Sequence, residues 1–474
     1  MGSTQKIKGL LRGIVGEKHI LIGDLMSSYC TDWTKKYSSN PIAVVRPAST
    51  KEVSNILSVC YKHNISMVPI AGNTGLSGGT HAEGSVMISL ERLNQIRSIK
   101  KESHVAIVEA GVILSKLHIA AGDFNLVFPL TFGAKGSAMI GGILSTNAGG
   151  SNVLRYGSTR TLCLGLEVVL PDGRIMNLMN ELHKDNTGYD LKDLIIGAEG
   201  TLGIITAVVL KLSPKPIAYA TAMLAMNSLE TALKVLNTLQ KNSGGCVEAF
   251  EYMPKNYIDT YLSKVPNARQ PFDTLYDINI MLEIGTTTSD EGLLLTNGKS
   301  LLVEKLEEIL SELLKTGDLL DVVIAQSESQ RNEMWERREA SAEITITNDP
   351  LIITDVAVPL EKVSIFINRM NKIIQQIDPG SRELTVAHLG DGNIHYAIYP
   401  TKFDEVLFDR LTNRLEEVTH ELGGSFSAEH GIGLSKKKSM ERRKDPVALE
   451  VMRSIKMGLD PKNLMNPGKV LPDP

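Results

Sequence analysis

The sequence predicts an α+β protein with two main domains and a short helical segment at the C-terminus. Short apolar strands alternate with amphipathic helices along the 474-residue chain, a length that allows two or three domains. Glycines gather in three stretches of the first part and thin out beyond Pro214 and Pro216, and the last residues are basic and helical in pattern. We therefore expect domains at 1–216 and 217–435, followed by a helical segment at 436–474.

The first domain is expected to alternate strands and helices. A strand followed by a helix fits residues 42–62, because Ser49 and Thr50 can cap a helix whose apolar residues recur at helical spacing. Further strands are expected at 65–70, 86–90 and 105–110.

The second domain is expected to repeat a strand-then-helix order. A strand and a helix share residues 351–377, and further helices fit 229–239, 301–314 and 329–346. This order predicts an antiparallel sheet with helices on one face.

Charge and composition exclude several classes of function. Lys and Arg total 50 and Asp and Glu total 54, so the net charge of -4 gives no reason to expect nucleic acid as a partner. The four cysteines form no CxxC motif, which excludes a zinc ribbon or a self-contained iron–sulfur cluster. The sequence shows neither a secretory signal pattern nor a membrane-spanning apolar run, so we expect a soluble, cytoplasmic protein.

The three glycine-rich stretches are the strongest functional signal. Glycine lets the backbone approach a pyrophosphate closely, and successive N–H groups can form an anion-binding nest. The first stretch reads Gly72-x-x-Gly75-x-x-Gly78-Gly79, which differs from the GxGxxG motif of nicotinamide enzymes. One such loop is more often a tight turn, but three of them indicate a phosphate-binding cradle.

Segments 69–80, 141–157 and 196–206 resemble the three loop motifs of the vanillyl-alcohol-oxidase type of FAD-binding domain. The resemblance implies a two-subdomain FAD-binding domain, an α+β substrate-binding cap domain with an antiparallel sheet, and bound FAD. Some relatives link FAD covalently through a His after Ser-Gly-Gly; here that place holds Thr80, so we expect non-covalent FAD. By position, the implied FAD contacts are Pro69, Gly72, Asn73, Thr74, Gly75, Leu76, Ser77, Gly78, Gly79, Gly136, Ser137, Gly141, Gly142, Ser145, Thr146, Asn147, Gly149, Gly150, Glu199, Gly200, Gly203, Ile204, Ile205 and Asn466.

The C-terminal motifs at 388–395, 429–431 and 466–469 are similar to those of the FAD-linked D-2-hydroxyacid dehydrogenases. The resemblance covers nearly the whole chain. Segments 132–137 and 184–192 look most like the branch of that family that oxidises D-2-hydroxyglutarate.

His388 and His395 flank a Gly-Asp-Gly-Asn run that predicts a hairpin. With a loop at 390–393 the two histidines would be opposite each other and face the same way. Glu429 adds a carboxylate, and two His with one Glu suit a catalytic zinc or a non-haem iron site; without metal, the pair would merely hydrogen-bond across the hairpin. The resemblance implies metal on these three residues, with zinc as our expectation. His430 is expected to act as the base that takes the hydroxyl proton, the alternative being a partner to the metal.

Arg338 lies on a predicted helix where the family places its substrate-binding Arg, with Ser341 as a neighbouring contact. A guanidinium suits a carboxylate, although the charged residues around it also fit a solvated helix face. The chain departs from the hydroxyglutarate branch at Ala342, where that branch has Thr, and at Ile353, where it has Lys. Both changes remove expected contacts of a second substrate carboxylate.

The resemblance therefore implies FAD-dependent, metal-assisted oxidation of a D-2-hydroxy acid, with D-2-hydroxyglutarate narrowly ahead of D-lactate or glycolate. A flavin-binding subunit of an electron-transfer complex and a metal hydrolase are the alternatives from other classes. Without a nicotinamide fingerprint or cluster ligands, we expect electrons to pass to an electron-transfer flavoprotein or a quinone. The sequence leaves the oligomeric state open.

Overall fold

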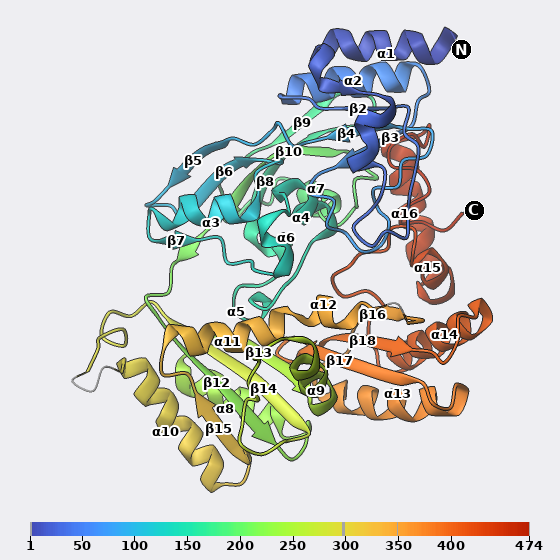
Figure 1. Ribbon diagram of the computed structural model, residues 1–474. Helices are drawn as coiled ribbons and strands as arrows, with labels where there is room; N and C mark the ends of the chain where they lie inside the picture. The colour runs from blue at the N-terminus through green and yellow to red at the C-terminus, as the bar shows by residue number, and fades with distance from the viewer. Residues whose placement is uncertain (1, 296–298, 348, 474) are drawn as a thin grey trace.

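The computed structural model describes residues 2–295, 299–347 and 349–473. The chain forms two halves, one stacked above the other in the view of Figure 1, with the N-terminal residues in the upper half. The lower half contains the middle of the chain, and the last two helices lie beside the upper half.

The upper half contains two separate sheets, as expected of two subdomains. The first has the order β1-β2-β4-β3 and the second the order β5-β6-β10-β8-β9. Their strands are β1 (Ile20–Leu21), β2 (Ala43–Val45), β3 (Met67–Ile70), β4 (Val86–Ser89), β5 (Ile96–Lys100), β6 (Val105–Glu109), β8 (Cys163–Val169), β9 (Ile175–Leu178) and β10 (Ile204–Lys211). A small pair joins β7 (Leu126–Val127) to β11 (Ser213–Pro214).

Helices pack against these sheets around a large apolar core, and a smaller apolar cluster lies on the first sheet. In α2 (Thr50–Lys62), the Ser49 side chain caps the first turn, and Val53, Ile56 and Leu57 are fully buried, as the periodicity predicts. The other helices are α1 (Gly2–Val15), α3 (Leu114–Gly122), α4 (Ile140–Thr146), α5 (Val153–Tyr156), α6 (Thr159–Leu162) and α7 (Leu191–Ile195).

The lower half is built on a seven-stranded sheet with the order β15-β12-β14-β13-β17-β18-β16. Every neighbouring pair in it is antiparallel, which confirms the expected sheet. The strands are β12 (Ala218–Met226), β13 (Val247–Pro254), β14 (Ile278–Thr286), β15 (Asp321–Ile324), β16 (Ile352–Ala357), β17 (Arg382–His388) and β18 (Asn393–Tyr399).

Helices cover both faces of this sheet, so the expectation of helices on one face is wrong. In the inner strands, residues alternate between two apolar clusters: in β14, Ile280 and Leu282 join one and Met281 the other. The first cluster packs against α8 (Ala232–Ser243), α10 (Leu301–Lys315), α13 (Val363–Ile377) and α14 (Glu405–Glu421). The second packs against α9 (Lys255–Lys264), α11 (Glu328–Glu339) and α12 (Ser341–Thr345). The central strands β12, β13 and β14 are buried along nearly their whole length, which is typical of a sheet covered on both faces.

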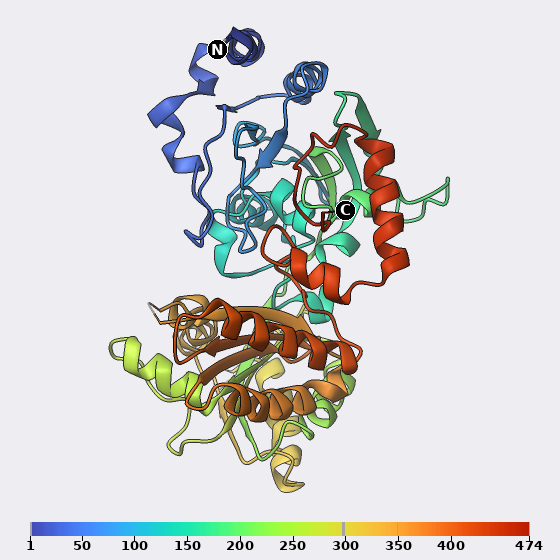
Figure 2. The ribbon, with the colours of Figure 1, turned by 90° about the vertical axis from the view of Figure 1, so that its right-hand side faces the viewer.

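The C-terminal segment returns to the upper half after α15 (Lys437–Arg443) and α16 (Pro446–Leu459). Met67 of β3 donates its N–H to Leu464 O and accepts from Asn466 N, at 2.7 Å each. Figure 2 shows α16 beside the upper half. Among the described residues, no helix is both long and apolar enough to cross a membrane.

Candidate active site

The three glycine-rich stretches come together as one cradle. A Cβ on Gly72 of the first stretch would lie 2.3 Å from the Ser137 carbonyl oxygen of the second. A Cβ on Gly200 of the third would lie 2.5 Å from the Pro69 ring, and Glu199 donates its N–H to Ser145 O at 2.8 Å. Only glycine permits these backbone approaches.

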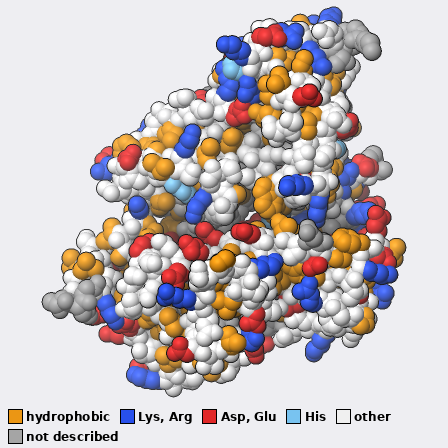
Figure 3. Space-filling view, in the orientation of Figure 1, with side chains coloured by type: hydrophobic (Ala, Val, Ile, Leu, Met, Phe, Trp, Pro, Cys, Tyr) orange, Lys and Arg blue, Asp and Glu red, His pale blue; other side chains and the backbone are white. Residues whose placement is uncertain are grey.

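The cradle fits a bound polar group such as a dinucleotide. The Asn466 Oδ1 and His81 Nδ1 atoms are buried and have no hydrogen-bond partner among the described residues. A ligand in the cradle can supply the hydrogen bonds that these atoms lack. The Thr80 hydroxyl donates to Asn73 Oδ1 at 2.8 Å, within the first loop. Figure 3 shows that the surface is hollowed where the two halves meet.

Several predicted FAD contacts also pack within the fold. Ile204 and Ile205 are buried in the core. A Cβ on Gly203 would lie 2.7 Å from a Val168 methyl, and one on Gly141 would lie 2.7 Å from Ala110 Cβ. These glycines allow the loops to sit close to their sheet.

The histidine hairpin forms, but its predicted register is wrong. His388 is opposite Asn393, and His395 is opposite Val386, because the turn spans 389–392. Gly392 has a φ of 81° there, and its N–H and that of Asp391 donate to His388 O. The shift is two residues, an even number, so both histidines still share one face. Their ring centroids are 5.3 Å apart.

Glu429 links the two histidines. Its Oε2 lies 3.7 Å from His395 Nε2 and 3.9 Å from His388 Nε2. A Cβ on Gly149, in the second glycine-rich stretch, would lie 2.3 Å from Glu429 Oε1. The predicted metal donors therefore meet directly against the FAD cradle.

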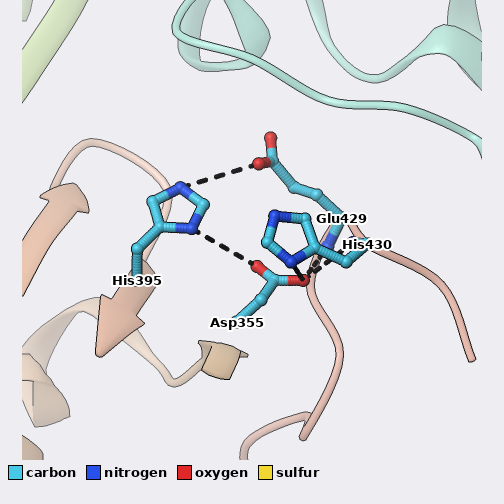
Figure 4. Close-up of side chains that lie close together, drawn as sticks. All are labelled: Asp355, His395, Glu429 and His430. Carbon is cyan, nitrogen blue, oxygen red and sulfur yellow. Dashed lines mark hydrogen bonds and ion pairs between the residues drawn. The ribbon is translucent and has the colours of Figure 1, made fainter. Parts of the chain in front are cut away.

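A tighter group of four donors includes Asp355, which sequence reasoning did not select. One ligand atom each of Asp355, His395, Glu429 and His430 lies within 4.8 Å of all the others, as Figure 4 shows in close-up. His388 lies outside this group and adjoins it through Glu429. The signal available was a carboxylate inside the mostly apolar strand β16.

Asp355 is fully buried and holds the segment that carries Glu429 and His430. Its Oδ2 accepts the backbone N–H groups of those two residues at 2.9 and 2.8 Å, and its Oδ1 accepts from Asn393 Nδ2 at 2.9 Å. Burial raises the pKa of Asp355, but the charges of His430, Lys436 and His395 outweigh it, so the net direction is down. Asp355 is thus an anchor that stays ionised.

The protonation of the other donors fits a bound cation. Burial raises the pKa of Glu429 to about 7, the expected behaviour of a buried carboxylate without a counter-ion, and a divalent cation would reverse it. Burial also lowers the pKa of His395 and of His430, which favours the neutral imidazoles that ligate metals and accept protons. At His388 burial also lowers the pKa, but the charge of Glu251 outweighs it, so the net direction is up.

Arg338 lies beside this group and is buried. Its Nε donates to Glu251 Oε2 at 2.7 Å, and its two Nη atoms lie 3.3 Å from Ser341 Oγ and 3.4 Å from His388 Nδ1. Glu251 also accepts from His388 Nδ1 at 2.9 Å. Sequence reasoning missed Glu251, whose only signal is a carboxylate in the mostly apolar strand β13, which also contains Glu248.

Comparisons with known proteins agree with this geometry. The family model described as "FAD linked oxidases, C-terminal domain" matches residues 215–470, and "FAD binding domain" matches residues 41–179. The chain is 36% identical to D-2-hydroxyglutarate dehydrogenase, mitochondrial, of Arabidopsis thaliana, over 97% of this chain and 80% of that protein. It is 32% identical to D-2-hydroxyglutarate dehydrogenase of Stutzerimonas stutzeri (strain A1501), over 94% of each.

Solved structures share the fold. A crystal structure of p-cresol methylhydroxylase with substrate bound matches with a TM-score of 0.74 at 16% identity, covering 99% of this chain and 97% of that one. Alkyldihydroxyacetonephosphate synthase matches with a TM-score of 0.73 at 16% identity, covering 98% of this chain and 86% of that one.

Proposed function

Because the chain belongs to the FAD-linked oxidase family, we propose that it oxidises a D-2-hydroxy acid with non-covalent FAD and a divalent metal, zinc being the first candidate. The observation that carries the proposal is the contact of Gly149 with Glu429, since it unites the FAD cradle and the metal donors in one site. The geometry offers less to a hydrolase, which would have no use for the cradle. It also offers less to a flavin subunit without turnover, which would have no use for the donors.

Each residue has a part in this reaction. A divalent cation on His388, His395 and Glu429 supplies Lewis acidity, and FAD supplies the hydride acceptor. Asp355 lies 3.8 Å from His430 Nδ1, and Figure 4 shows the other ring nitrogen directed toward the space between His395 and Glu429. That nitrogen takes the proton of the substrate hydroxyl in the proposed role of His430 as base.

Arg338 holds the substrate carboxylate. Its Nε is engaged by Glu251, which fixes the guanidinium plane. Each Nη atom carries two N–H groups, so beside its contact with Ser341 or His388 it can donate to a carboxylate. Ser341 Oγ lies next to one of them and offers a further hydrogen bond. A 2-hydroxy acid held in this way has its hydroxyl beside the metal donors, because Arg338 contacts His388.

D-2-hydroxyglutarate is the first substrate to test, because relatives of that name match over nearly the whole chain. An electron-transfer flavoprotein or a quinone as acceptor and a cytoplasmic location complete the proposal. Both are expectations from the sequence.

A second candidate substrate is a D-2-hydroxy monocarboxylate such as D-lactate. Ile353 is opposite Ala397, which is opposite Leu384, so an apolar row crosses the sheet next to the pair Asp355–His395. Arg337 and Lys135 are engaged with other groups: Arg337 donates to Arg269 O, and Lys135 pairs with Glu339 at 3.4 Å.

A panel of 2-hydroxy acids tests the proposal. The purified protein, assayed for flavin and metal content, is mixed with D and L forms of each acid and an artificial acceptor dye. We expect dye reduction with D-2-hydroxyglutarate or D-lactate and little with the L forms. A protein that contains flavin and metal and oxidises neither D acid contradicts the proposal.

A further inference from the structure

The catalytic loop, residues 427–435, carries Glu429 and His430 and is held from both sides. Asp355 of the lower half accepts two of its backbone N–H groups, as described above. The upper half holds the rest of the loop through two residues that belong to the glycine-rich stretches. The loop thus sits between the FAD cradle and the sheet that carries the histidines.

Glu199 of the third glycine-rich stretch is the first of these holders. Its Oε1 accepts from Ile432 N at 2.6 Å, and its Oε2 accepts from Gly433 N at 2.8 Å. A Cβ on Gly431 would lie 2.7 Å from Glu199 Oε1, so the loop is shaped to receive this carboxylate. Glu199 itself has a φ of 51°, a conformation that a non-glycine residue adopts at a cost and that aims its side chain at the loop.

Ser77 of the first glycine-rich stretch is the second holder. Its hydroxyl donates to His430 O at 2.9 Å, and its carbonyl oxygen accepts from Leu434 N at 2.8 Å and from Ser435 N at 3.2 Å. A Cβ on Gly433 would lie 2.1 Å from Ser77 O. The loop backbone is therefore fitted to the cradle from His430 to Ser435.

We propose that Glu199, assisted by Ser77, is a positioning residue for the metal ligand Glu429 and the base His430, rather than a residue that binds FAD. Both carboxylate oxygens of Glu199 already accept hydrogen bonds from the loop. Removal of one acceptor leaves a backbone N–H of the loop without its partner and lets Glu429 move relative to the histidines.

This inference rests on the proposed metal-assisted function, and a metal-binding measurement tests it. The variant Glu199→Gln keeps the size of the side chain but can accept only one of the two hydrogen bonds. With FAD retained, we expect its affinity for Co²⁺, measured by competition with a chelator, to fall by about 10–100-fold, as for other groups that orient metal ligands. The visible spectrum of bound Co²⁺ should also change, because Glu429 no longer holds its place.

Two further variants guard the interpretation. Glu109→Gln removes a carboxylate that likewise accepts a backbone N–H, from Gln95, in the same half, and should leave Co²⁺ affinity unchanged. Ser77→Ala deletes the hydroxyl bonded to His430 O and should lower Co²⁺ affinity by a smaller factor with FAD retained. It also remains informative if Glu199→Gln fails to fold.

The outcomes are distinct. Loss of FAD by Glu199→Gln, or by Ser77→Ala if the former does not fold, overturns the assignment and makes these residues cofactor contacts. Unchanged Co²⁺ affinity and spectrum in a variant, beside a wild-type protein that binds Co²⁺, overturn this inference alone. A wild-type protein that binds no Co²⁺ overturns the proposed function as well.

Discussion

The FAD cradle and the proposed catalytic face meet at Gly149 and Glu429, yet they are built by opposite means. The catalytic face consists of the side chains of Glu251, Arg338, Asp355, His388, His395, Glu429 and His430. The cradle depends on glycines, which have no Cβ. A Cβ on Gly72, Gly149 or Gly200 would collide with a neighbouring loop. The catalytic face depends on charged atoms held in place, with Asp355 and Glu251 buried inside strands. The cradle should therefore fail when an atom is added, and the catalytic face when one is removed or neutralised.

The largest effect is expected from neutralising the base. His430→Gln should keep FAD and metal but lower kcat by about 10²–10⁴-fold, the usual contribution of a positioned acid–base group. Flavin reduction in a single turnover is the measurement. Reduction at the wild-type rate would remove His430 from the role of base.

A smaller loss should follow removal of the charge that orients two site residues. Glu251 holds both Arg338 and His388, so Glu251→Gln should lower kcat/KM by about 10–100-fold. Glu383→Gln is the control and should keep near-normal activity. Glu383 lies in the neighbouring strand β17, and its carboxylate accepts hydrogen bonds from Thr385 and Asn256. Equal losses in the two variants would show a general effect on the sheet.

On the cradle side, one added methyl group should weaken FAD binding and spare the metal. Gly72→Ala places a Cβ 2.3 Å from Ser137 O, and overpacking of this kind costs about 1–3 kcal/mol, or about 5–150-fold in FAD affinity. Gly122→Ala, in α3 of the same half, is the matched control, because its Cβ meets nothing within 4 Å and Gly122 is not among the predicted FAD contacts. Flavin titration of the apoproteins decides the matter. Equal FAD affinity of the two variants would contradict the idea that the cradle fails when an atom is added.

The smallest effect concerns the choice of acid. Ile353 is 38% exposed, so a new charge pair there is worth up to about 1 kcal/mol. If a monocarboxylate is the native substrate, Ile353→Lys should raise kcat/KM for D-2-hydroxyglutarate relative to D-lactate by up to about fivefold, and Ile353→Met should not. No gain, or a loss, would indicate that hydroxyglutarate is native and held by another cation.

The same contrast explains how far the sequence could predict the structure. Each cradle motif lies within a short segment, so the glycine spacing predicted the loops directly. The apolar periodicity of residues 50–62 likewise predicted helix α2. The catalytic face is assembled from distant strands, and only residues with a chemical signature, such as His388 and Glu429, could be selected. Asp355 and Glu251 were missed because a carboxylate within a strand does not reveal its partners. The predicted hairpin register was wrong because the turn, with Gly392 at a positive φ, lies one residue earlier in the chain than expected. The partner of each residue on the opposite strand is thereby shifted by two.

Metal dependence of flavin reduction tests the central claim most directly. Holoprotein is mixed anaerobically with D-2-hydroxyglutarate or D-lactate, and the visible absorption of the flavin is followed before chelation, after chelation, and after Zn²⁺ is restored. We predict bleaching by one of the acids, a loss of nearly all the bleaching rate on chelation while FAD stays bound, and recovery with Zn²⁺. Bleaching that proceeds at full rate after the metal has been removed would contradict metal-assisted oxidation at this site.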